Sequence, residues 1–315
     1  MQTKIQQLKQ EISKQVIGQE HMVEALLIGL FTNGHILLEG VPGLAKTTTV
    51  NALSKVLSLD FKRVQFTPDL LPSDILGAQI YDMKSGEFKI KKGPVFTNLL
   101  LADEINRAPA KVQSALLEVM QEKQVTIGEE SFKVDLPFLV LATQNPVEQE
   151  GAYTLPEAQL DRFMFKIIVG YNTKEEEYEI ASKVANASFA TINSVLEKND
   201  IDIIKNEISK VHIDKELEEY IVNLIFATRE PENYGLSEVK DLLQFGASPR
   251  ATIDMFKAVK AKAYLRGNSH VTPVDIALVF KDVLRHRIIL SYEAEALEIS
   301  TDDILQKVIE KVLVP

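Results

Sequence analysis

The feature that most constrains this fold is a glycine-rich turn, Gly40-Val41-Pro42-Gly43-Leu44-Ala45-Lys46-Thr47. An apolar run, Ile36 to Leu38, precedes the turn, and a helical pattern, Thr48 to Leu53, follows it. A strand, a glycine-rich turn and a helix in this order are the setting of a phosphate-binding loop. Backbone N–H groups of such a loop surround phosphate oxygens, and the positive N-terminus of the helix points at the same oxygens.

Two side chains of this turn have the chemistry that a bound nucleotide needs. The Lys46 ammonium is expected to reach the β- and γ-phosphates, and the Thr47 hydroxyl is expected to ligate Mg²⁺. The general pattern has a glycine where this chain has Ala45, and a methyl group there is tolerated if that residue already has helical dihedral angles. The alternative reading is a chance glycine-rich turn before a helix.

Composition indicates an ordinary globular protein. The length of 315 residues suggests about two domains, and 45% hydrophobic with 25% charged residues is typical of a soluble chain. The absence of cysteine excludes disulfides, zinc–thiolate sites and thiol nucleophiles. The net charge of −10 argues against a nucleic-acid binder driven by bulk charge, although a local basic pore remains compatible with it.

The chain shows no targeting or membrane segment in its pattern. Met1 to Gln7 lacks an apolar signal core, and no apolar run approaches the length of a membrane span, so we expect a cytoplasmic protein. The five histidines are scattered without the spacing of metal ligands, and we interpret them as surface or satisfied core residues.

A second candidate element of the site is an apolar run that ends in two acids. Asn98 to Glu104 is typical of a parallel strand buried on both faces. Acids at the carboxyl end of such a strand lie in the crevice where open α/β sheets bind ligands. Asp103 would hold Mg²⁺, and Glu104 would activate or orient a water. The alternative is a helix N-terminal acid pair, because a helical pattern begins near Pro109.

Three further polar residues stand beside predicted elements. Asn145 ends the buried strand Pro137 to Thr143 and suits a contact to water or the γ-phosphate, or else it is a turn residue. Arg162, before a fifth apolar strand, suits a local pair with Asp161 or Glu157, or an arginine finger for a neighbouring subunit. Arg250 lies in the first turn of a helix, where the helix dipole favours an anionic partner, either a phosphate or Asp254.

Two predicted hairpins and an early turn complete the first half. The hairpins span residues 78–90 and 124–134, and the lysines at 89, 91 and 92 indicate a solvated edge or, less simply, a polymer or protein surface. The turn Val16-Ile17-Gly18, just before the helix from Glu20 to Phe31, suits either an adenine floor or a plain interhelix connection.

The strands are expected to stop after Tyr171, and everything from residue 201 onward is expected to be helical. The predicted helices span 201–211, 214–228, 238–245, 249–265, 273–287 and 302–313. This change from α/β to all-α predicts an α/β core domain at residues 1–186 and a helical domain at 187–315.

Four motifs together resemble those of MoxR-type AAA+ ATPases. They are the Gly40–Thr47 loop as Walker A, Leu99–Pro109 as Walker B, Ala142-Thr143-Gln144-Asn145-Pro146, and Gly246-Ala247-Ser248-Pro249-Arg250. The match is dense over residues 15–170 and looser to about residue 300, and alanine at position 45 is usual in that branch. The resemblance implies a P-loop αβα core with a five-stranded parallel sheet, two β-hairpin insertions and an all-α lid.

The resemblance also implies roles and partners. Asn145 would be sensor 1, Arg250 sensor 2 and Arg162 a finger acting in trans, with Val16, Ile17 and Gly18 at the adenine. The residues Gly40, Val41, Pro42, Gly43, Leu44, Ala45, Lys46, Thr47 and Thr48 would bind ATP, and Thr47 and Asp103 would hold Mg²⁺. Such proteins form rings, usually hexamers, and remodel or metal-load partner proteins, often ones with von Willebrand factor A domains.

The expected function is therefore Mg²⁺-dependent ATP hydrolysis that drives chaperone-like work on partner proteins. Two other classes stay open. One is a nucleic-acid motor, which the acidic charge balance disfavours. The other is a nucleotide-switched scaffold whose turnover is incidental.

Overall fold

The computed structural model describes residues 1–41, 43–145 and 153–315. The chain divides into two compact units. Apart from Gln2, the first unit holds residues 1–159 and 167–201, and the second holds 160–166 and 202–315. A domain boundary after residue 186 stays a prediction.

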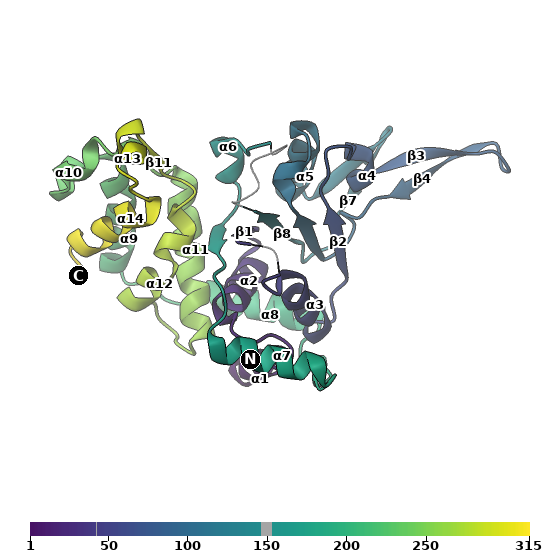
Figure 1. Ribbon diagram of the computed structural model, residues 1–315, viewed down its shortest axis with the longest axis horizontal. Helices are drawn as coiled ribbons and strands as arrows, with labels where there is room; N and C mark the ends of the chain where they lie inside the picture. Colours follow the sequence, from purple (N-terminus) through teal and green to yellow (C-terminus); the bar gives the residue numbers. More distant parts are fainter. Residues whose placement is uncertain (42, 146–152) are drawn as a thin grey trace. The chain divides into compact units, whose positions relative to one another are not determined.

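The first unit contains a five-stranded sheet in the order β2-β5-β8-β1-β9 (Figure 1). Its strands are β1 (Ile36–Glu39), β2 (Phe61–Gln65), β5 (Leu99–Asp103), β8 (Leu139–Gln144) and β9 (Phe165–Ile168). The pairs β1–β8, β5–β8 and β2–β5 are parallel, and the central strands are buried along nearly their whole length. Continuous apolar runs form these strands because both faces of the sheet are covered. The predicted five-stranded parallel core is confirmed.

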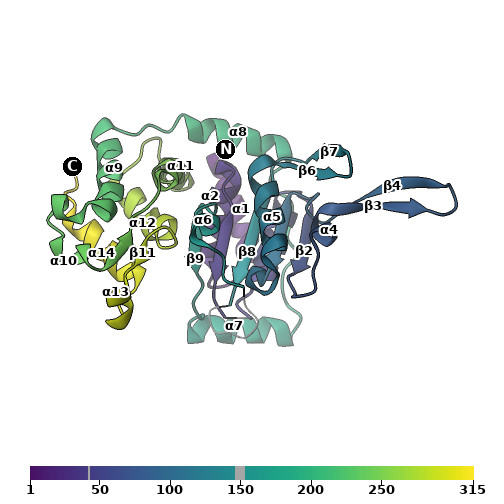
Figure 2. The ribbon, with the colours of Figure 1, turned by 90° about the horizontal axis from the view of Figure 1, so that it is seen from above.

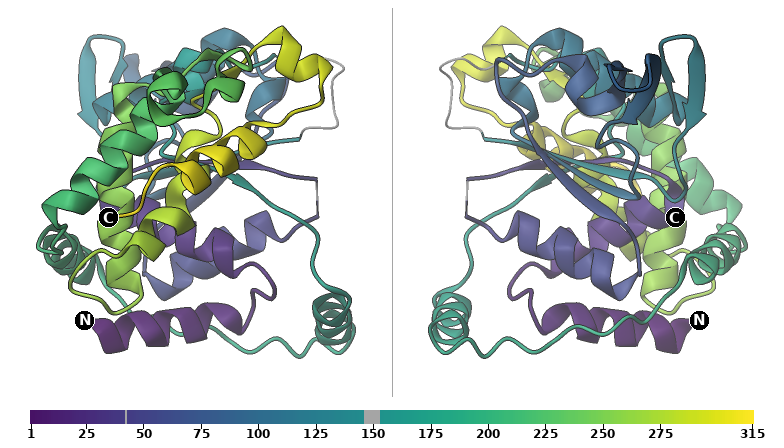
Figure 3. Two further views of the ribbon diagram at one scale, coloured as in Figure 1. Left: turned by 90° about the vertical axis from the view of Figure 1, so that its left-hand side faces the viewer. Right: turned by 90° about the vertical axis from the view of Figure 1, so that its right-hand side faces the viewer.

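Helices cover both faces of this sheet (Figure 3). The helices before residue 186 are α1 (Gln2–Ser13), α2 (Glu20–Thr32), α3 (Lys46–Val56), α4 (Pro72–Leu76), α5 (Ala110–Glu122), α6 (Glu157–Leu160) and α7 (Lys174–Ala185), with a 3₁₀ turn, η1 (Ile105–Arg107). The helices α2 and α3 lie on one side of the sheet, and α4 and α5 lie on the other. Almost every apolar side chain of α2 is buried, so this helix forms part of the core.

Both predicted hairpins are present. The strands β3 (Gly77–Asp82) and β4 (Glu87–Lys92) form a long antiparallel hairpin that projects from the sheet (Figure 2). The strands β6 (Gln124–Ile127) and β7 (Glu130–Lys133) form a shorter one. The aromatic rings of Tyr81 and Phe88 pack on each other across the long hairpin, with 5.3 Å between their centroids.

The second unit is mainly helical, as the sequence predicts. Elements beyond residue 197 are α8 (Lys198–Ser209), α9 (Lys215–Arg229), η2 (Pro231–Tyr234), α10 (Ser237–Lys240), β10 (Leu243–Phe245), α11 (Pro249–Leu265), α12 (Pro273–Leu284), β11 (Ile289–Leu290), α13 (Tyr292–Ala296) and α14 (Thr301–Lys311). The helix α11 packs against α9 and α12, and α14 packs against α9 and α12.

The predicted helix at residues 238–245 is wrong in its second half, and so is the expectation that no strand follows Tyr171. Only Ser237–Lys240 is helical, and Leu243–Phe245 forms a strand that pairs with Ile289–Leu290. A short apolar run carries too little periodicity to separate helix from strand, and the pairing partner lies more than 40 residues away.

One buried histidine of the core is held in a single neutral form. His35 Nδ1 accepts a hydrogen bond from the Val140 N–H at 3.0 Å, so its Nε2 donates to the Met120 carbonyl at 3.1 Å. The ring thus ties β8 to the end of α5, as expected for a satisfied core histidine. Burial lowers the pKa of His35 to about 4, because the charged ring loses its hydration.

We expect this histidine to make the protein sensitive to mild acid. The His35 ring takes up a proton near pH 6.5 in the unfolded chain but only near pH 4 in the folded chain. Its contribution to the free energy of unfolding is therefore fully present above pH 6.5 and is lost as the pH falls toward 4. The loss between pH 7.5 and 5 is about 2 kcal/mol for this group. Urea unfolding of wild type and His35→Gln at several pH values measures it.

In that comparison the His35→Gln chain should lose stability less steeply with acid, whatever its stability at pH 7.5. The exposed His212 gives a matched control, because His212→Gln removes a histidine that is not buried. Equal slopes for wild type and His35→Gln would contradict the buried neutral ring.

Candidate functional site

The phosphate loop connects β1 to α3, and two of its glycines are required for different reasons. Gly43 has φ = 90°, a conformation that other residues rarely adopt, although a side chain there would meet no atom. Gly40 has no such φ, but a Cβ there would lie 2.7 Å from the Val169 carbonyl oxygen. Pro42 lies outside the described residues.

Ala45 has left-handed helical dihedral angles, φ = 54° and ψ = 18°, immediately before the first residue of α3. The expectation that Ala45 has the dihedral angles of the helix that follows is therefore wrong, and an L-residue in this region carries a steric cost that glycine does not. The general pattern has a glycine at this position for that reason.

We expect Ala45→Gly to be accepted and to raise the free energy of unfolding by up to about 1 kcal/mol, since glycine removes the strain at some cost in chain entropy. Ala45→Val should act in the opposite direction, because a β-branched residue is least suited to positive φ. Thermal unfolding of the two variants tests the pair. A destabilised glycine variant would contradict the left-handed conformation.

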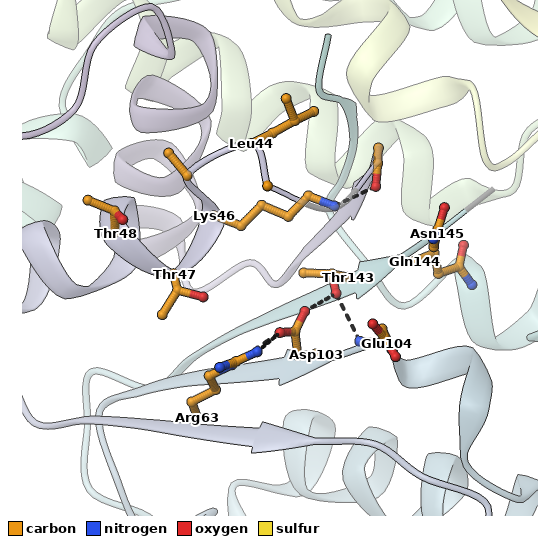
Figure 4. Close-up of a pocket in the computed structure, with 13 residues that line it drawn as sticks. Leu44, Lys46, Thr47, Thr48, Arg63, Asp103, Glu104, Thr143, Gln144 and Asn145 are labelled. Carbon is orange, nitrogen blue, oxygen red and sulfur yellow. Dashed lines mark hydrogen bonds and ion pairs between the residues drawn. The ribbon is translucent and has the colours of Figure 1, made fainter. Parts of the chain in front are cut away.

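Lys46, the first residue of α3, turns back over the loop (Figure 4). Its Nζ donates to the Gly40 carbonyl oxygen at 2.7 Å. Burial lowers the pKa of the Lys46 ammonium, and the nearby Asp103 and Glu104 carboxylates oppose that shift. The ammonium is therefore partly desolvated and lies close to two acids.

The two acids at the end of β5 have different surroundings. The Asp103 carboxylate accepts a hydrogen bond from the Thr143 hydroxyl at 2.6 Å and a further pair from the Arg63 guanidinium. Glu104 lies just past the strand with φ = 57°, and its N–H donates to the same Thr143 hydroxyl at 2.9 Å. Thr143 on β8 thus fixes both acids relative to each other (Figure 4).

The turn after Glu104 is held by one buried amide. The Gln113 side chain donates to the carbonyls of Ile105, Ala108 and Tyr153 at 3.0–3.2 Å. Arg107, within this turn, lies 3.0 Å from the Glu104 carboxylate. The direction of the Glu104 side chain is therefore set by a connected structure and not by a mobile loop end.

The phosphate loop and the two acids line one pocket of about 350 Å³ in the first unit. The lining consists of Gly40, Gly43, Leu44, Ala45, Lys46, Thr47, Thr48, Arg63, Asp103, Glu104, Thr143, Gln144 and Asn145. The described loop residues except Val41, both acids and Asn145 are thus brought together. Sequence reasoning missed Arg63, Thr143 and Gln144, although the position of the last two at the carboxyl end of a central strand is a signal for them.

Comparison with known proteins places the chain in a family. Residues 35–165 match the model of the "ATPase family associated with various cellular activities (AAA)", and residues 236–308 match the "AAA lid domain". "Chaperone MoxR1" of Mycobacterium tuberculosis is 48% identical over 97% of this chain and 81% of its own length. The chain belongs to the MoxR family of AAA+ ATPases.

Other relatives agree with this membership. "Protein MoxR" of Methylorubrum extorquens is 30% identical over 98% of this chain and 94% of its own length. The crystal structure of a candidate ATPase from Cytophaga hutchinsonii has a TM-score of 0.95 and 55% identity, and covers 100% of this chain and 96% of its own. Nucleotide binding is a property of this family, and the predicted AAA+ core with a helical lid is confirmed.

In this MoxR-family chain the donors at the pocket suit Mg²⁺. The Thr47 hydroxyl and the Asp103 carboxylate both line the pocket, and Mg²⁺ prefers oxygen ligands with few of them from protein. No cluster of three or more histidine, cysteine or acidic ligands occurs among the described residues.

Arg162 and Arg250 both belong to the second unit, and both lie near Asp161 in sequence or space. The Asp161 carboxylate accepts a hydrogen bond from the Ser248 hydroxyl at 2.8 Å and forms ion pairs with Arg287 at 3.1 Å and Arg250 at 3.5 Å. Asp254, the local partner considered for Arg250, instead pairs with Arg287 at 2.6 Å. Arg250 is half-exposed and has the longest contact to Asp161 of these three partners.

The turn Val16-Ile17-Gly18 is fixed to the chain that follows β9. Gln19 donates to the Asn172 side chain at 2.7 Å, and Asn172 in turn donates to the Ile17 carbonyl at 3.5 Å. Val16 is buried, and Gly18 has φ = 71°. None of these three residues lines the pocket formed by the described part of the phosphate loop.

None of the helices in the described ranges is long and apolar enough to cross a membrane.

Proposed function

We propose that this protein hydrolyses ATP in an Mg²⁺-dependent manner, as a subunit of a ring that remodels partner proteins. The observation that carries the proposal is the single pocket in which Lys46, Thr47, Asp103, Glu104 and Asn145 meet. Family membership adds ATPase chemistry to this geometry, and one relative carries the name chaperone.

The proposed division of labour follows from charge and position. Lys46 and the loop N–H groups hold the phosphates, and Glu104 accepts a proton from the attacking water, which Asn145 orients. Thr47 and Asp103 would hold Mg²⁺, which would supply positive charge to neutralise the phosphates. Val41, Pro42, Leu44 and Thr48 complete the loop, and Val16, Ile17 and Gly18 border the adenine.

Two arginines complete the proposed site. Arg250 acts as sensor 2, and Arg162 acts as a finger on the nucleotide of the neighbouring subunit, where a guanidinium stabilises transition-state charge. A finger from a neighbour requires a closed ring, for which a hexamer is the expected form. We also propose that its work on partner proteins includes metal-cofactor insertion and that it acts with proteins that contain von Willebrand factor A domains.

The experiment that tests the proposal measures mass by light scattering together with ATP turnover. Glu104→Gln keeps the size and hydrogen bonding of the side chain but removes the base. We expect this variant to assemble with Mg·ATP and to lose turnover by about a hundredfold or more. A protein that stays monomeric while wild type turns over ATP at full rate would overturn the ring and the finger.

The same variant separates the other two function classes. If Glu104→Gln supports partner function as well as wild type does, a nucleotide-switched scaffold replaces the motor. Steeply salt-dependent binding of DNA or RNA would favour a nucleic-acid motor, which the net charge of −10 disfavours.

A further inference from the structure

Arg63 is the one basic side chain besides Lys46 that lines the nucleotide pocket within the described residues. It lies on β2, and its neighbour in the sheet, β5, carries Asp103. Gln65 pairs with Asp103 in register, so Arg63, two residues earlier, projects from the same face of the sheet. Its guanidinium reaches forward along the strand to the carboxylate (Figure 4).

The contact occupies one oxygen of the carboxylate that is proposed to hold Mg²⁺. Arg63 Nε donates to Asp103 Oδ2 at 3.1 Å, and Arg63 Nη2 donates to the same oxygen at 2.5 Å. The other oxygen, Oδ1, accepts the Thr143 hydroxyl at 2.6 Å. Both carboxylate oxygens therefore accept hydrogen bonds: Oδ1 from Thr143 on the central strand β8, and Oδ2 from Arg63.

The two partners differ in their freedom to move. The Asp103 side chain is only 16% exposed, whereas the Arg63 side chain is 49% exposed. A carboxylate at that burial is stabilised by a cation close to it, and a half-exposed arginine can leave at modest cost. Gln65 Oε1 accepts from Arg63 Nη2 at 3.2 Å and gives the guanidinium a second acceptor on its own strand.

We propose that Arg63 is an internal counter-ion that competes with Mg²⁺ for Asp103 and so sets how strongly nucleotide binding depends on the metal. This inference rests on the proposed Mg·ATP site. An arginine and a divalent cation cannot share one oxygen without mutual repulsion, so Mg²⁺ at Asp103 displaces the guanidinium. Arg63 is thus a positioning residue for the metal ligand.

The test measures how much Mg²⁺ tightens nucleotide binding, expressed as a ratio of two dissociation constants. An ion pair with only a structural role would leave this ratio unchanged. The dissociation constant of a slowly hydrolysed fluorescent ATP analogue is determined in EDTA and in saturating Mg²⁺, and the first value is divided by the second. Removing Arg63 leaves the Asp103 carboxylate beside the phosphates without its counter-ion when no metal is bound, and it removes a competitor when the metal is present. Both effects raise the ratio, and Arg63→Ala is expected to raise it about two- to fivefold.

A matched control is available on the same strand. Lys62 is exposed, donates to the Phe96 carbonyl and does not line the pocket, so Lys62→Ala removes the same charge one residue away. It should leave the ratio unchanged. An equal rise in both variants would mean a general loss of positive charge and would overturn the proposal, as would an unchanged ratio in Arg63→Ala.

A double-variant cycle assigns the effect to Asp103. In an Asp103→Asn background the side chain keeps its shape but loses the charge for which Arg63 competes, so adding Arg63→Ala should leave the ratio unchanged. A rise of the same size in both backgrounds would overturn the proposal. If Mg²⁺ fails to tighten nucleotide binding even in wild type, the proposed metal site itself is wrong. With normal tightening in wild type, only the role of Arg63 is at stake.

Discussion

Lys46→Ala is expected to raise the dissociation constant for Mg·ATP on the order of a hundredfold, because hydrogen bonds to a charged donor contribute roughly 3 kcal/mol at such a site. The ammonium is partly buried, with Asp103, Glu104 and Glu39 close enough to affect its pKa. Its removal leaves these acids facing the phosphates without compensation. Turnover is expected to fall with binding, and isothermal calorimetry with a turnover assay measures both.

The control for this variant lies on the same helix. Lys55 is an exposed lysine in the last turn of α3, and Lys55→Ala removes one positive charge without touching the pocket. It should leave the affinity within about twofold of wild type. An unchanged affinity in Lys46→Ala would contradict the assignment of residues 40–47 as a phosphate loop, whatever Lys55→Ala does.

Much of this site was predictable because its parts are local in the sequence. The glycine-rich turn follows an apolar run directly, and the acids Asp103 and Glu104 end another. Parallel strands bring their carboxyl ends to one edge, so the loop, the acids and Asn145 are expected near each other once the strands are recognised. No pairing between distant residues has to be known for that step.

Arg63 was not predictable for the opposite reason. Its contact to Asp103 depends on β2 lying beside β5 and on the register that sets Gln65 opposite Asp103. Neither the strand order nor the register is written in the alternation of residues 61–66. The partner of Arg250 was unpredictable for the same reason. Its acidic neighbour is Asp161, 89 residues away in the sequence, and not Asp254, which is one helical turn away.

Backbone conformation sets another limit on sequence reasoning. Ala45 and Glu104 both have positive φ, although neither residue type favours it. Each caps the start of a helical segment: Ala45 precedes Lys46 at the start of α3, and Glu104, which carries the carboxylate itself, precedes η1. Strained positions of this kind are common at functional sites, where the surrounding structure imposes them.

Arg162→Ala is expected to leave Mg·ATP binding within about twofold of wild type and to lower turnover by about a thousandfold, the range associated with a finger that stabilises transition-state charge. Arg162→Lys keeps the charge but loses the planar fork, so its turnover should remain low. The exposed Lys307 of the same unit provides a control, since Lys307→Ala should have wild-type turnover.

Mixing two inactive variants tests whether Arg162 acts on a neighbouring subunit. An Arg162→Ala subunit retains Glu104, and a Glu104→Gln subunit retains Arg162, so an interface between them contains one complete site when the finger acts in trans. Random assembly of equal amounts forms such interfaces at about a quarter of positions in a closed ring. Turnover in the mixture should therefore exceed that of either variant alone and should peak near equal amounts. If every mixing ratio gives only the average of the two inactive proteins, Arg162 does not act in trans, and the proposed closed ring loses the reason for which it is required.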